Sequence, residues 1–473
     1  MLYVLGSLLL LILVLVIRAL LFRPREKQVA YAAATAINET RAVETFRQMI
    51  RCRTISYDDP ALKDEAEFEK FRVLLDERYP QIAANCEKHC IEPAGIVYHW
   101  KGNSARHPWV LMAHYDVVPV EEDQWTENPF DAVIKDGAVW GRGTVDTKCT
   151  LLGVMEAVET LLEQGFTPQN DIYLCFGGDE ELEGKSAQAI VKWFDQQGIS
   201  PNVLDEGGAI VNHVFPGVST PAAVIGTGEK GHTNFAFTLR GAGGHASSPA
   251  PHTPVGRMAK AICKIENHPF KAEMVPPVAD LFNTLGRYAG FGMRLIFANL
   301  WCFKPLLFVL GKRMGGEFNA LMRTTCAFTK MEGGTAWNVI PPTVFAGADV
   351  RLLNQTPEQA AQEFQKIIAN DQIQIDIVTP TPPSPYSLTE GAAWDTLKEA
   401  VRQTWPGVIV TPYLMMAASD SRHYARISDR VYRFCPMEMP SEIRKTIHGH
   451  NERIPMETLL KIIAFYLCFI QKI

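Results

Sequence analysis

The stretch Trp140–Lys148, WGRGTVDTK, lies between two segments of opposite character. Trp109–Ala113, before it, is an apolar run typical of a buried strand, and Thr150–Gln164, after it, has the apolar spacing of an amphipathic helix. Loops between a strand and a helix are where open α/β sheets usually bind their ligands. We therefore expect the carboxylate of Asp146 to lie in a ligand site.

Strands and helices alternate on both sides of this stretch. Glu39–Arg51 and Asp64–Glu77 have helical patterns, and Ile96–Trp100 and Ile172–Phe176 have the patterns of strands. A last helix is expected at Met456–Gln471. Such alternation predicts the α/β class, with a mostly parallel sheet that has helices on both of its faces.

The length and charge of the chain exclude several classes of protein. With 473 residues it is too long for one ordinary domain, and its 47% of hydrophobic residues are enough for a large core. A net charge of −6, with no basic cluster in the body, argues against nucleic acid as a partner. The ten cysteines have no regular spacing, so we expect no disulfide framework.

Two motifs that each follow an apolar run supply candidate metal ligands. His114 follows the first run in the sequence AHYD, where Asp116 can accept the N–H of the imidazole. The second motif is GGDEELEG, residues 177–184, in which adjacent carboxylates can divide the work. Glu181 would bind a metal ion and Glu180 would act as a general base. Taken alone, either motif is equally compatible with a solvated loop.

Two later motifs add ligands of the same kind. VLDEGG places Asp205 after a short apolar run, and IHGHNERI supplies His448 and His450 just before the last helix. Together with Asp146 and the earlier motifs, they form a set of nitrogen and oxygen ligands at strand ends and loops. This set suits a two-metal hydrolytic site, with zinc as the expected metal.

The order of these motifs resembles that of a known enzyme family. AHYDVVP, WGRGTVDTK, GGDEELEG, LDEGG, GGHASSP, WNVIPP, DVR and IHGHNER follow one another as in the M20 family of metallopeptidases. Within that family, the chain is most similar to the branch of Gly-X carboxypeptidases (carboxypeptidase S) and N-acyl-amino-acid hydrolases. The features of that branch are the apolar N-terminus, the segment PPVADLF at Pro276–Phe282 and the long apolar insert before TTCAFT.

The resemblance implies two metal positions that share one ligand. One zinc ion would be held by His114, Asp146 and Asp205, and the other by Asp146, Glu181 and His448. Cobalt or manganese could substitute for zinc. His448, rather than His450, matches the family's H-G-x-N-E pattern. The family often has a cis peptide bond after the bridging aspartate, here between Asp146 and Thr147.

The resemblance also implies roles beyond the metal ligands. Glu180 would be the general base, and Asp116 would orient His114. In the family the insert mediates dimerisation, and a histidine of the neighbouring subunit's insert reaches the oxyanion, a role that maps to His245 in GGHASSP. Asn338 of WNVIPP and Arg351 of DVR fall where the family binds the carboxylate end of the substrate.

The chain departs from the family pattern at one point. Many relatives have Gly-Gly-Thr where this chain has AASDSRH, residues 417–423. Ser419 could still donate a hydrogen bond to substrate, but the loss of two glycines changes the pocket, and the choice of substrate stays open.

The chain is expected to divide into five segments, with the catalytic domain in two parts. Residues 1–22 would be a transmembrane anchor, 23–38 a tether, 39–216 and 346–473 the catalytic domain, and 217–345 an inserted, smaller α+β dimerisation or lid domain. Within the insert, Phe291–Leu310 is unusually apolar and could be a buried helical hairpin, a lipophilic substrate wall or a membrane-facing patch. Arg294, Lys304 and Pro305 argue against a second membrane span.

The N-terminus has the length of a membrane-spanning helix. Leu2–Ile17 carries no charge, and after the interruption at Arg18 the apolar run continues to Phe22. The positive charges follow the run, which favours an uncleaved anchor over a cleaved signal peptide. They also favour a cytoplasmic body, although one short segment sets the sidedness only weakly.

The expected reaction is hydrolysis of an amide bond. Two metal ions can activate a water molecule and polarise a carbonyl, while Glu180 carries the proton. The substrate would be an N-acyl amino acid or a short peptide with a free carboxylate. The alternatives are an aminopeptidase-type dipeptidase and a metal-free relative that retains the fold as a binding module.

Overall fold

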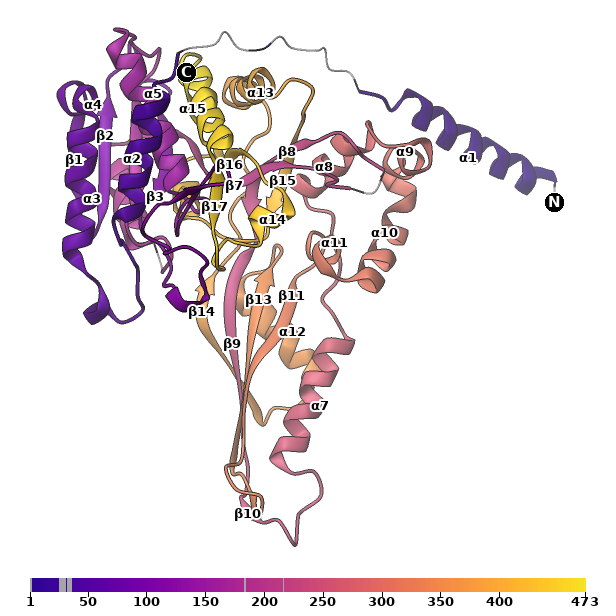
Figure 1. Ribbon diagram of the computed structural model, residues 1–473. Helices are drawn as coiled ribbons and strands as arrows, with labels where there is room; N and C mark the ends of the chain where they lie inside the picture. Colours follow the sequence, from indigo (N-terminus) through magenta and orange to yellow (C-terminus); the bar gives the residue numbers. More distant parts are fainter. Residues whose placement is uncertain (1, 25–30, 32–35, 183, 216) are drawn as a thin grey trace.

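An eight-stranded sheet forms the centre of the computed structural model, which describes residues 2–24, 31, 36–182, 184–215 and 217–473 (Figure 1). In sheet order, the strands are β1 (Glu87–Ile91), β2 (Gly95–Trp100), β6 (Ile172–Gly177), β3 (Trp109–His114), β7 (Asn202–Val211), β16 (Val431–Glu438), β8 (Ala222–Glu229) and β15 (Ile409–Met415). The central strands β6, β3, β7 and β16 are parallel neighbours, and β8 is parallel to β15. The antiparallel pairs are β1–β2, β2–β6, β16–β8 and β7–β8.

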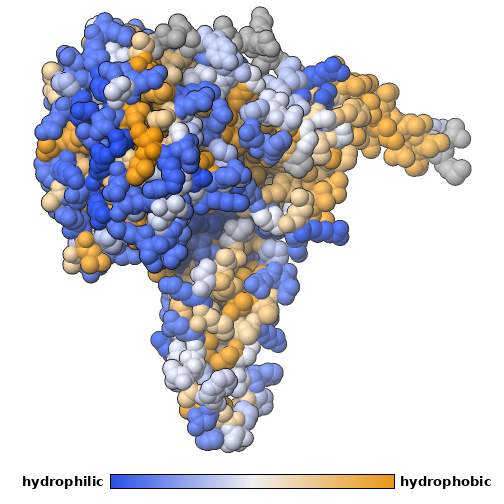
Figure 2. All heavy atoms as spheres, viewed as in Figure 1, coloured by the Kyte–Doolittle hydropathy of each residue, from blue (hydrophilic) through white to orange (hydrophobic). Residues whose placement is uncertain are grey.

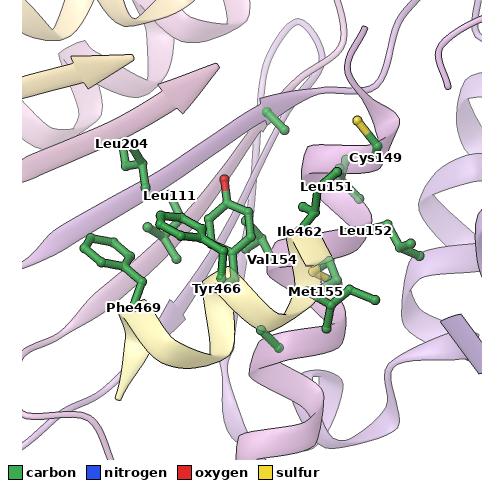
Figure 3. Packing of buried hydrophobic residues seen from close by; sticks show 14 of the residues in the cluster. Leu111, Cys149, Leu151, Leu152, Val154, Met155, Leu204, Ile462, Tyr466 and Phe469 are labelled. Carbon is green, nitrogen blue, oxygen red and sulfur yellow. The ribbon is translucent and has the colours of Figure 1, made fainter. Parts of the chain in front are cut away.

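Helices cover both faces of this sheet, as predicted. Leu111 of β3 points to the face covered by α5 (Lys148–Glu163) and α15 (Met456–Ile470), where its neighbours in the core include Tyr466 (Figure 3). Val110, one residue earlier, points to the opposite face, which is covered by α6 (Lys185–Gln196). The alternation of side chains along a strand therefore supplies two separate cores from the same apolar run. The α/β class of the catalytic domain is confirmed.

The helices before the sheet begin where their capping residues predict. The side chain of Asn38 accepts a hydrogen bond from the backbone N–H of Arg41 at the start of α2 (Glu39–Arg51). Asp64 does the same for α3 (Glu65–Arg78), and a short helix, α4 (Pro80–Asn85), follows. Asparagine and aspartate are favoured at this position because their oxygen satisfies a free backbone donor.

The insert contains its own antiparallel sheet, which extends away from the large one (Figure 1). Its order is β11 (Thr325–Glu332), β13 (Thr343–Leu352), β9 (Gly231–Arg240) and β14 (Ile373–Thr381). Helices α7 (Pro254–Asn267) and α12 (Pro357–Ile368) bury apolar residues against it. Two short strands, β10 (Gly244–His245) and β12 (Val339–Ile340), pair at the far tip.

The predicted boundaries of the insert, 217–345, are wrong at both ends. Strand β8 lies inside that range but belongs to the large sheet, whereas α12 and β14 lie after it and complete the small sheet. Only Lys230 separates β8 from β9, so one strand-like stretch passes from one sheet into the other. Both segments have the composition of strands, and what differs is their burial: β8 is buried at every position, whereas β9 alternates between buried and half-buried residues.

A helical layer covers the edge of the large sheet beside β15. It consists of α8 (Pro276–Gly286), α9 (Phe291–Phe297), α10 (Leu300–Met314) and α11 (Gly316–Ala320). Phe297 and Leu307 are buried with Val224 of β8 and Ile409 of β15. The apolar stretch of the insert is thus a helical hairpin bent by 105°, and only one of its sides is buried.

The N-terminal helix α1 (Leu2–Leu21) projects from the body beside α9 (Figure 1). Tyr3–Leu21 is long and apolar enough to cross a membrane, and most of it is exposed. Residues 25–30 and 32–35 of the predicted tether lie outside the described residues. Helix α13 (Ala392–Thr404) completes the packing around α15.

Candidate active site

The residues of the candidate site come largely from neighbouring parallel strands. His114 ends β3, Glu180 and Glu181 follow β6, and Glu206 lies in β7. Because β6, β3 and β7 are adjacent and parallel, their carboxyl ends meet at one edge of the sheet. Asp146 reaches the same place from the loop before α5.

Asp146 belongs to two groups of possible metal ligands. In the first group, His114 Nε2 lies 3.1 Å from Asp146 Oδ1 and 3.3 Å from Glu206 Oε1. In the second, His448 Nε2 lies 3.1 Å from Asp146 Oδ2 and 3.0 Å from Glu181 Oε2. Within each group the ligand atoms are all within 4.8 Å of one another. A carboxylate with one oxygen in each group has the geometry expected of a bridge.

The assignment of Asp205 to the first group is wrong in this structure, because Glu206 occupies that place. Asp205 is buried on the other side of β7, where its Oδ2 accepts a hydrogen bond from the backbone N–H of Ser421 at 3.1 Å. Consecutive residues of a strand point to opposite sides, so only one of the two acids in VLDEGG can face His114. The motif contained the correct residue, but its letters do not show which acid points inward.

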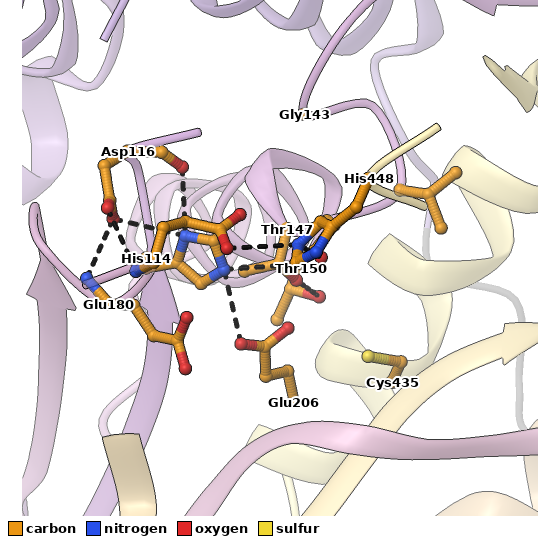
Figure 4. Close-up of polar contacts among 12 residues, drawn as sticks. His114, Asp116, Gly143, Thr147, Thr150, Glu180, Glu206, Cys435 and His448 are labelled. Atoms are coloured by element: carbon orange, nitrogen blue, oxygen red, sulfur yellow. Dashed lines mark hydrogen bonds and ion pairs between the residues drawn. The ribbon is translucent and has the colours of Figure 1, made fainter. Parts of the chain in front are cut away.

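Asp116 holds His114 and the GGDEELEG loop in one arrangement. His114 Nδ1 lies 3.0 Å from the backbone oxygen of Asp116 and 3.3 Å from its Oδ1 (Figure 4). The same carboxylate accepts hydrogen bonds from Ser56 Oγ at 2.7 Å and from the backbone N–H groups of Glu180 and Glu181 at 3.1 and 3.2 Å. Such support leaves Nε2 of His114 as the nitrogen that faces the site.

Glu452 is a positioning residue that the sequence reasoning missed. Its buried carboxylate accepts hydrogen bonds from the backbone N–H groups of Gly143, Val145 and Asp146 at 3.0, 2.7 and 3.1 Å, and from Arg142 Nη1 at 2.8 Å. Strand pairing brings it there, because β17 (Arg453–Pro455) pairs with β5 (Ala138–Trp140), which also pairs with β4 (Ile134–Lys135). The acid of the H-G-x-N-E pattern was the available signal.

The loop around Asp146 requires an unusual backbone. The peptide bond between Asp146 and Thr147 is cis, as the family resemblance implied. Gly143 has φ +84°, and a side chain there would place its Cβ 2.7 Å from Val117 Cγ1. The buried ammonium of Lys148 donates to the backbone oxygens of Met49 and Cys52, which attaches the start of α5 to the end of α2.

The site concentrates negative charge in a buried place. Burial raises the pKa of Glu180 well above its usual range, against the nearby charge of His114, and burial raises the pKa of Glu206 to about 7. Hydrogen bonds to Asp146 and Glu181 raise the pKa of His448 to about 10. Burial alone would lower the pKa of His114, but the charge of Glu206 and hydrogen bonds to carboxylates hold it well above its usual range.

This donor set fits divalent metal ions. Each group offers one imidazole nitrogen and two carboxylates, and together they bring more acids than histidines into one buried place. Carboxylates crowded in this way are stabilised by cations, and imidazole with carboxylate is a ligand combination typical of zinc and related metals.

The structure places the predicted site residues His245 and Asn338 away from the two groups of possible metal ligands. Both are exposed at the tip of the insert, where β10 pairs with β12 and the backbone oxygen of Asn338 accepts a hydrogen bond from Ala246 N–H at 3.0 Å (Figure 1). Within one chain the structure therefore does not bring them to the metal ligands.

The other two predicted substrate residues are nearer the base of the insert and already have partners. Arg351 Nε lies 3.0 Å from Asp349 Oδ1, and the second oxygen of that carboxylate is 2.7 Å from His232 Nε2. Ser419 is buried, and its Oγ donates to Glu229 Oε1 at 2.8 Å. Glu229 also pairs with the buried guanidinium of Arg433, so Ser419 belongs to a buried network that includes the sheet.

A hollow of about 610 Å³ lies between the insert and the catalytic domain. Leu182 of the GGDEELEG loop lines it from one side and His232, Asn234 and residues 378–385 from the other. Arg422 and Arg426 add positive charge to its wall. The hollow therefore joins the loop that carries Glu180 to the base of the insert.

Comparison with known proteins identifies relatives of similar length. The chain is 34% identical over 443 residues to the "Probable carboxypeptidase S-like 2" of Dictyostelium discoideum, covering 91% of this chain and 85% of that protein. It is 32% identical over 447 residues to the "N-fatty-acyl-amino acid synthase/hydrolase PM20D1" of Xenopus tropicalis, with the same coverage of 91% and 85%.

Solved structures share the fold at low sequence identity. The M20 family metallo-carboxypeptidase Sso-CP2 of Sulfolobus solfataricus is 17% identical with a TM-score of 0.65, covering 91% of this chain and 98% of that one. The YXEP protein of Bacillus subtilis, described as a dinuclear metal binding peptidase, is 15% identical with a TM-score of 0.57 over 92% and 97% of the two chains. Residues 110–472 match the peptidase family M20/M25/M40, and the chain belongs to this family.

Proposed function

We propose that the chain is a metal-dependent hydrolase that cleaves the amide bond of N-acyl amino acids or of short peptides with a free C-terminal carboxylate. The observation that carries the proposal is Asp146, which has one carboxylate oxygen in each of two histidine–carboxylate groups. The relatives named as a carboxypeptidase and as an N-fatty-acyl-amino acid hydrolase support the substrate class.

Two divalent metal ions would be held by the two groups. His114, Asp146 and Glu206 would hold one ion, and Asp146, Glu181 and His448 the other. We expect zinc, with cobalt or manganese as substitutes, because imidazole and carboxylate ligands suit all three. When bound, such a pair supplies Lewis acidity that polarises the scissile carbonyl and makes a water molecule easier to deprotonate.

Glu180 would carry the proton. Its backbone N–H is held by Asp116, and its half-buried side chain lies beside His114 and Glu206 without joining either ligand group (Figure 4). A carboxylate with a raised pKa can take a proton from water and release it to the leaving nitrogen. Asp116 would keep His114 in the orientation that points Nε2 at the metal.

The substrate would approach through the hollow between the two domains. The two arginines in its wall, Arg422 and Arg426, suit a substrate with a free carboxylate. The family resemblance assigns Arg351 to binding that carboxylate. Arg351 lies next to this wall, because Asp349 contacts both Arg351 and His232. Ser419 would contribute to the buried hydrogen-bond network behind the site. To donate a hydrogen bond to the substrate, it would first have to break its bond to Glu229.

His245 and Asn338 would act from a second copy of the chain. Their exposed position at the tip of the insert suits residues that complete a neighbouring subunit's site in a homodimer. In that role His245 would donate a hydrogen bond to the developing oxyanion, and Asn338 would bind the substrate's carboxylate end.

Helix α1 would anchor the protein in a membrane. It is apolar and exposed, and Arg18, the residue that interrupts its apolar run, donates to the backbone oxygen of Ala298 at 3.0 Å and to Asn299 Oδ1 at 3.1 Å. Because Arg18 attaches α1 to the body, we favour a retained anchor helix over a signal peptide that is removed.

Hydrolysis of a panel of substrates tests the proposed activity. N-acyl amino acids and free-amine dipeptides are compared with and without a chelator, with activity restored by added zinc. We expect cleavage of the N-acylated substrates that is lost with the chelator. Cleavage of free-amine dipeptides alone would favour the aminopeptidase-type alternative, and fewer than one metal ion per chain would favour a binding module.

A further inference from the structure

Helix α10 has apolar residues on two opposite sides. Leu307 and Gly311 are buried against the helical layer beside the large sheet. On the outward side, Leu306 and Val309 are about half exposed, and Trp301 is 61% exposed. A helix that is apolar on all sides is normally buried, so the outward side lacks the environment that its composition requires.

The bend at which α10 begins lies next to α1. Arg18 of α1 contacts Ala298 and Asn299, which form the bend between α9 and α10, and the buried side chain of Asn299 donates to the backbone oxygen of Leu15 at 3.0 Å. Figure 2 shows hydrophobic residues over α1 and on the adjoining part of the body. A bilayer that accepts α1 therefore comes close to α10.

The charges at the ends of this surface suit lipid headgroups. Lys312 and Arg313 are exposed in the last turn of α10. Exposed tryptophan and leucine flanked by basic residues are typical of helices that lie in the interface plane of a membrane. The bend of 105° between α9 and α10 also argues for a hairpin that lies on the membrane rather than one that crosses it.

We propose that the outward side of α10, formed by Trp301, Leu306, Val309, Leu310 and Met314, lies on the same bilayer that holds α1. This proposal rests on the membrane attachment proposed above for α1. The two contacts together would hold the body against the membrane at a fixed orientation, with α10 at the level of the headgroups and the tip of the insert left free for a second chain.

Native cysteines allow a test on the full-length chain. Cys302 lies on the outward side of α10, whereas Cys263 on α7 and Cys90 on β1 are exposed elsewhere on the body. The variant C90S/C263S leaves Cys302 for labelling with an environment-sensitive fluorophore, and C90S/C302S leaves Cys263 as the matched control. Burial raises the pKa of Cys326 to about 12, which keeps that thiol slow to react.

The labelled proteins are reconstituted in nanodiscs of phosphatidylcholine and phosphatidylglycerol, with and without doxyl-labelled lipid. We expect doxyl lipid to quench the label on Cys302 several-fold more than the label on Cys263, and the substitution L306E/V309E to abolish the difference. A third probe at Ser7, S7C without the other exposed cysteines, reports on α1 itself.

The probe at position 7 separates the two proposals. If doxyl lipid quenches it but aqueous iodide quenches the label on Cys302, the contact of α10 is overturned while the anchor stands. If iodide quenches both, the anchor fails as well. If neither quencher reaches Cys302, protein covers that surface, and the contact with lipid is overturned in favour of a second copy.

Discussion

The edge of the large sheet and the tip of the insert both carry motif residues, but only the first assembles them within one chain. At the sheet edge, His114 and Glu206 come from adjacent strands and their ligand atoms are 3.3 Å apart. At the tip, His245 and Asn338 are exposed on a pair of two-residue strands. The same kind of signal in the sequence therefore corresponds to a complete site in one region and to an incomplete one in the other.

The difference comes from strand direction. Parallel neighbours end at the same edge, so residues that follow different strands are brought together by the sheet itself. The strands of the insert's sheet are antiparallel. The short strands β10 and β12 lie at the outer end of the insert, away from the large sheet. In the proposed homodimer, residues at the tip would act on the neighbouring subunit's site.

Removing the shared ligand should have the largest effect. The variant Asp146→Asn weakens both ligand groups at once, and we expect activity to fall by about 10,000-fold or more, because several kcal/mol of transition-state stabilisation come from the metal pair. Metal analysis should show well below two ions per chain. Retention of two ions with full activity would show that Asp146 does not bridge them.

Removing the general base should be nearly as severe but should spare the metals. The variant Glu180→Gln keeps the shape of the side chain and loses its ability to accept a proton, so we expect kcat to fall by about 1,000-fold. Metal content should equal that of the wild type, which distinguishes this loss from that of Asp146→Asn. Near wild-type activity would move the proton transfer to another residue.

The tip of the insert should contribute to catalysis only in the site of the neighbouring subunit. The variant His245→Ala should lose about 100-fold in kcat, as expected for one oxyanion donor. Mixing it with Glu180→Gln under conditions that exchange subunits should restore about a quarter of the wild-type activity, because half of the dimers then contain one complete site. If mixing restores nothing although subunits exchange, His245 acts within its own chain or not at all.

Substitution of the two acids of VLDEGG should have the smallest effects. One substitution should affect metal binding and the other the stability of the fold. Glu206→Gln should weaken metal binding by about 10- to 100-fold, as measured by competition with a fluorescent chelator. Asp205→Ala should leave metal affinity nearly unchanged and lower the free energy of unfolding by about 1–3 kcal/mol, because it leaves the N–H of Ser421 unsatisfied. The reverse pattern would restore Asp205 as the ligand.

Much of the fold and of the site could be predicted from local patterns. The periodicity around Trp109–Ala113 and Thr150–Gln164 predicted β3 and α5, because a strand and a helix repeat at different intervals. The order of the motifs predicted the enzyme family, and the structure brings together His114, Asp146, Glu181 and His448, four of the candidate metal ligands. These features depend on short stretches whose chemistry is complete within a few residues.

Other features were decided by the tertiary structure. The phase of β7 places Glu206 rather than Asp205 beside His114, and the pairing of β17 with β5 brings Glu452 under the loop of Asp146. The passage from β8 to β9 moves the chain from one sheet to another with only Lys230 between the two strands. By itself the sequence determined which residue types are available and which elements form, because these follow from neighbours along the chain. Only the folded structure decided which side chain faces the site and where each sheet ends, because these depend on contacts between residues far apart in sequence.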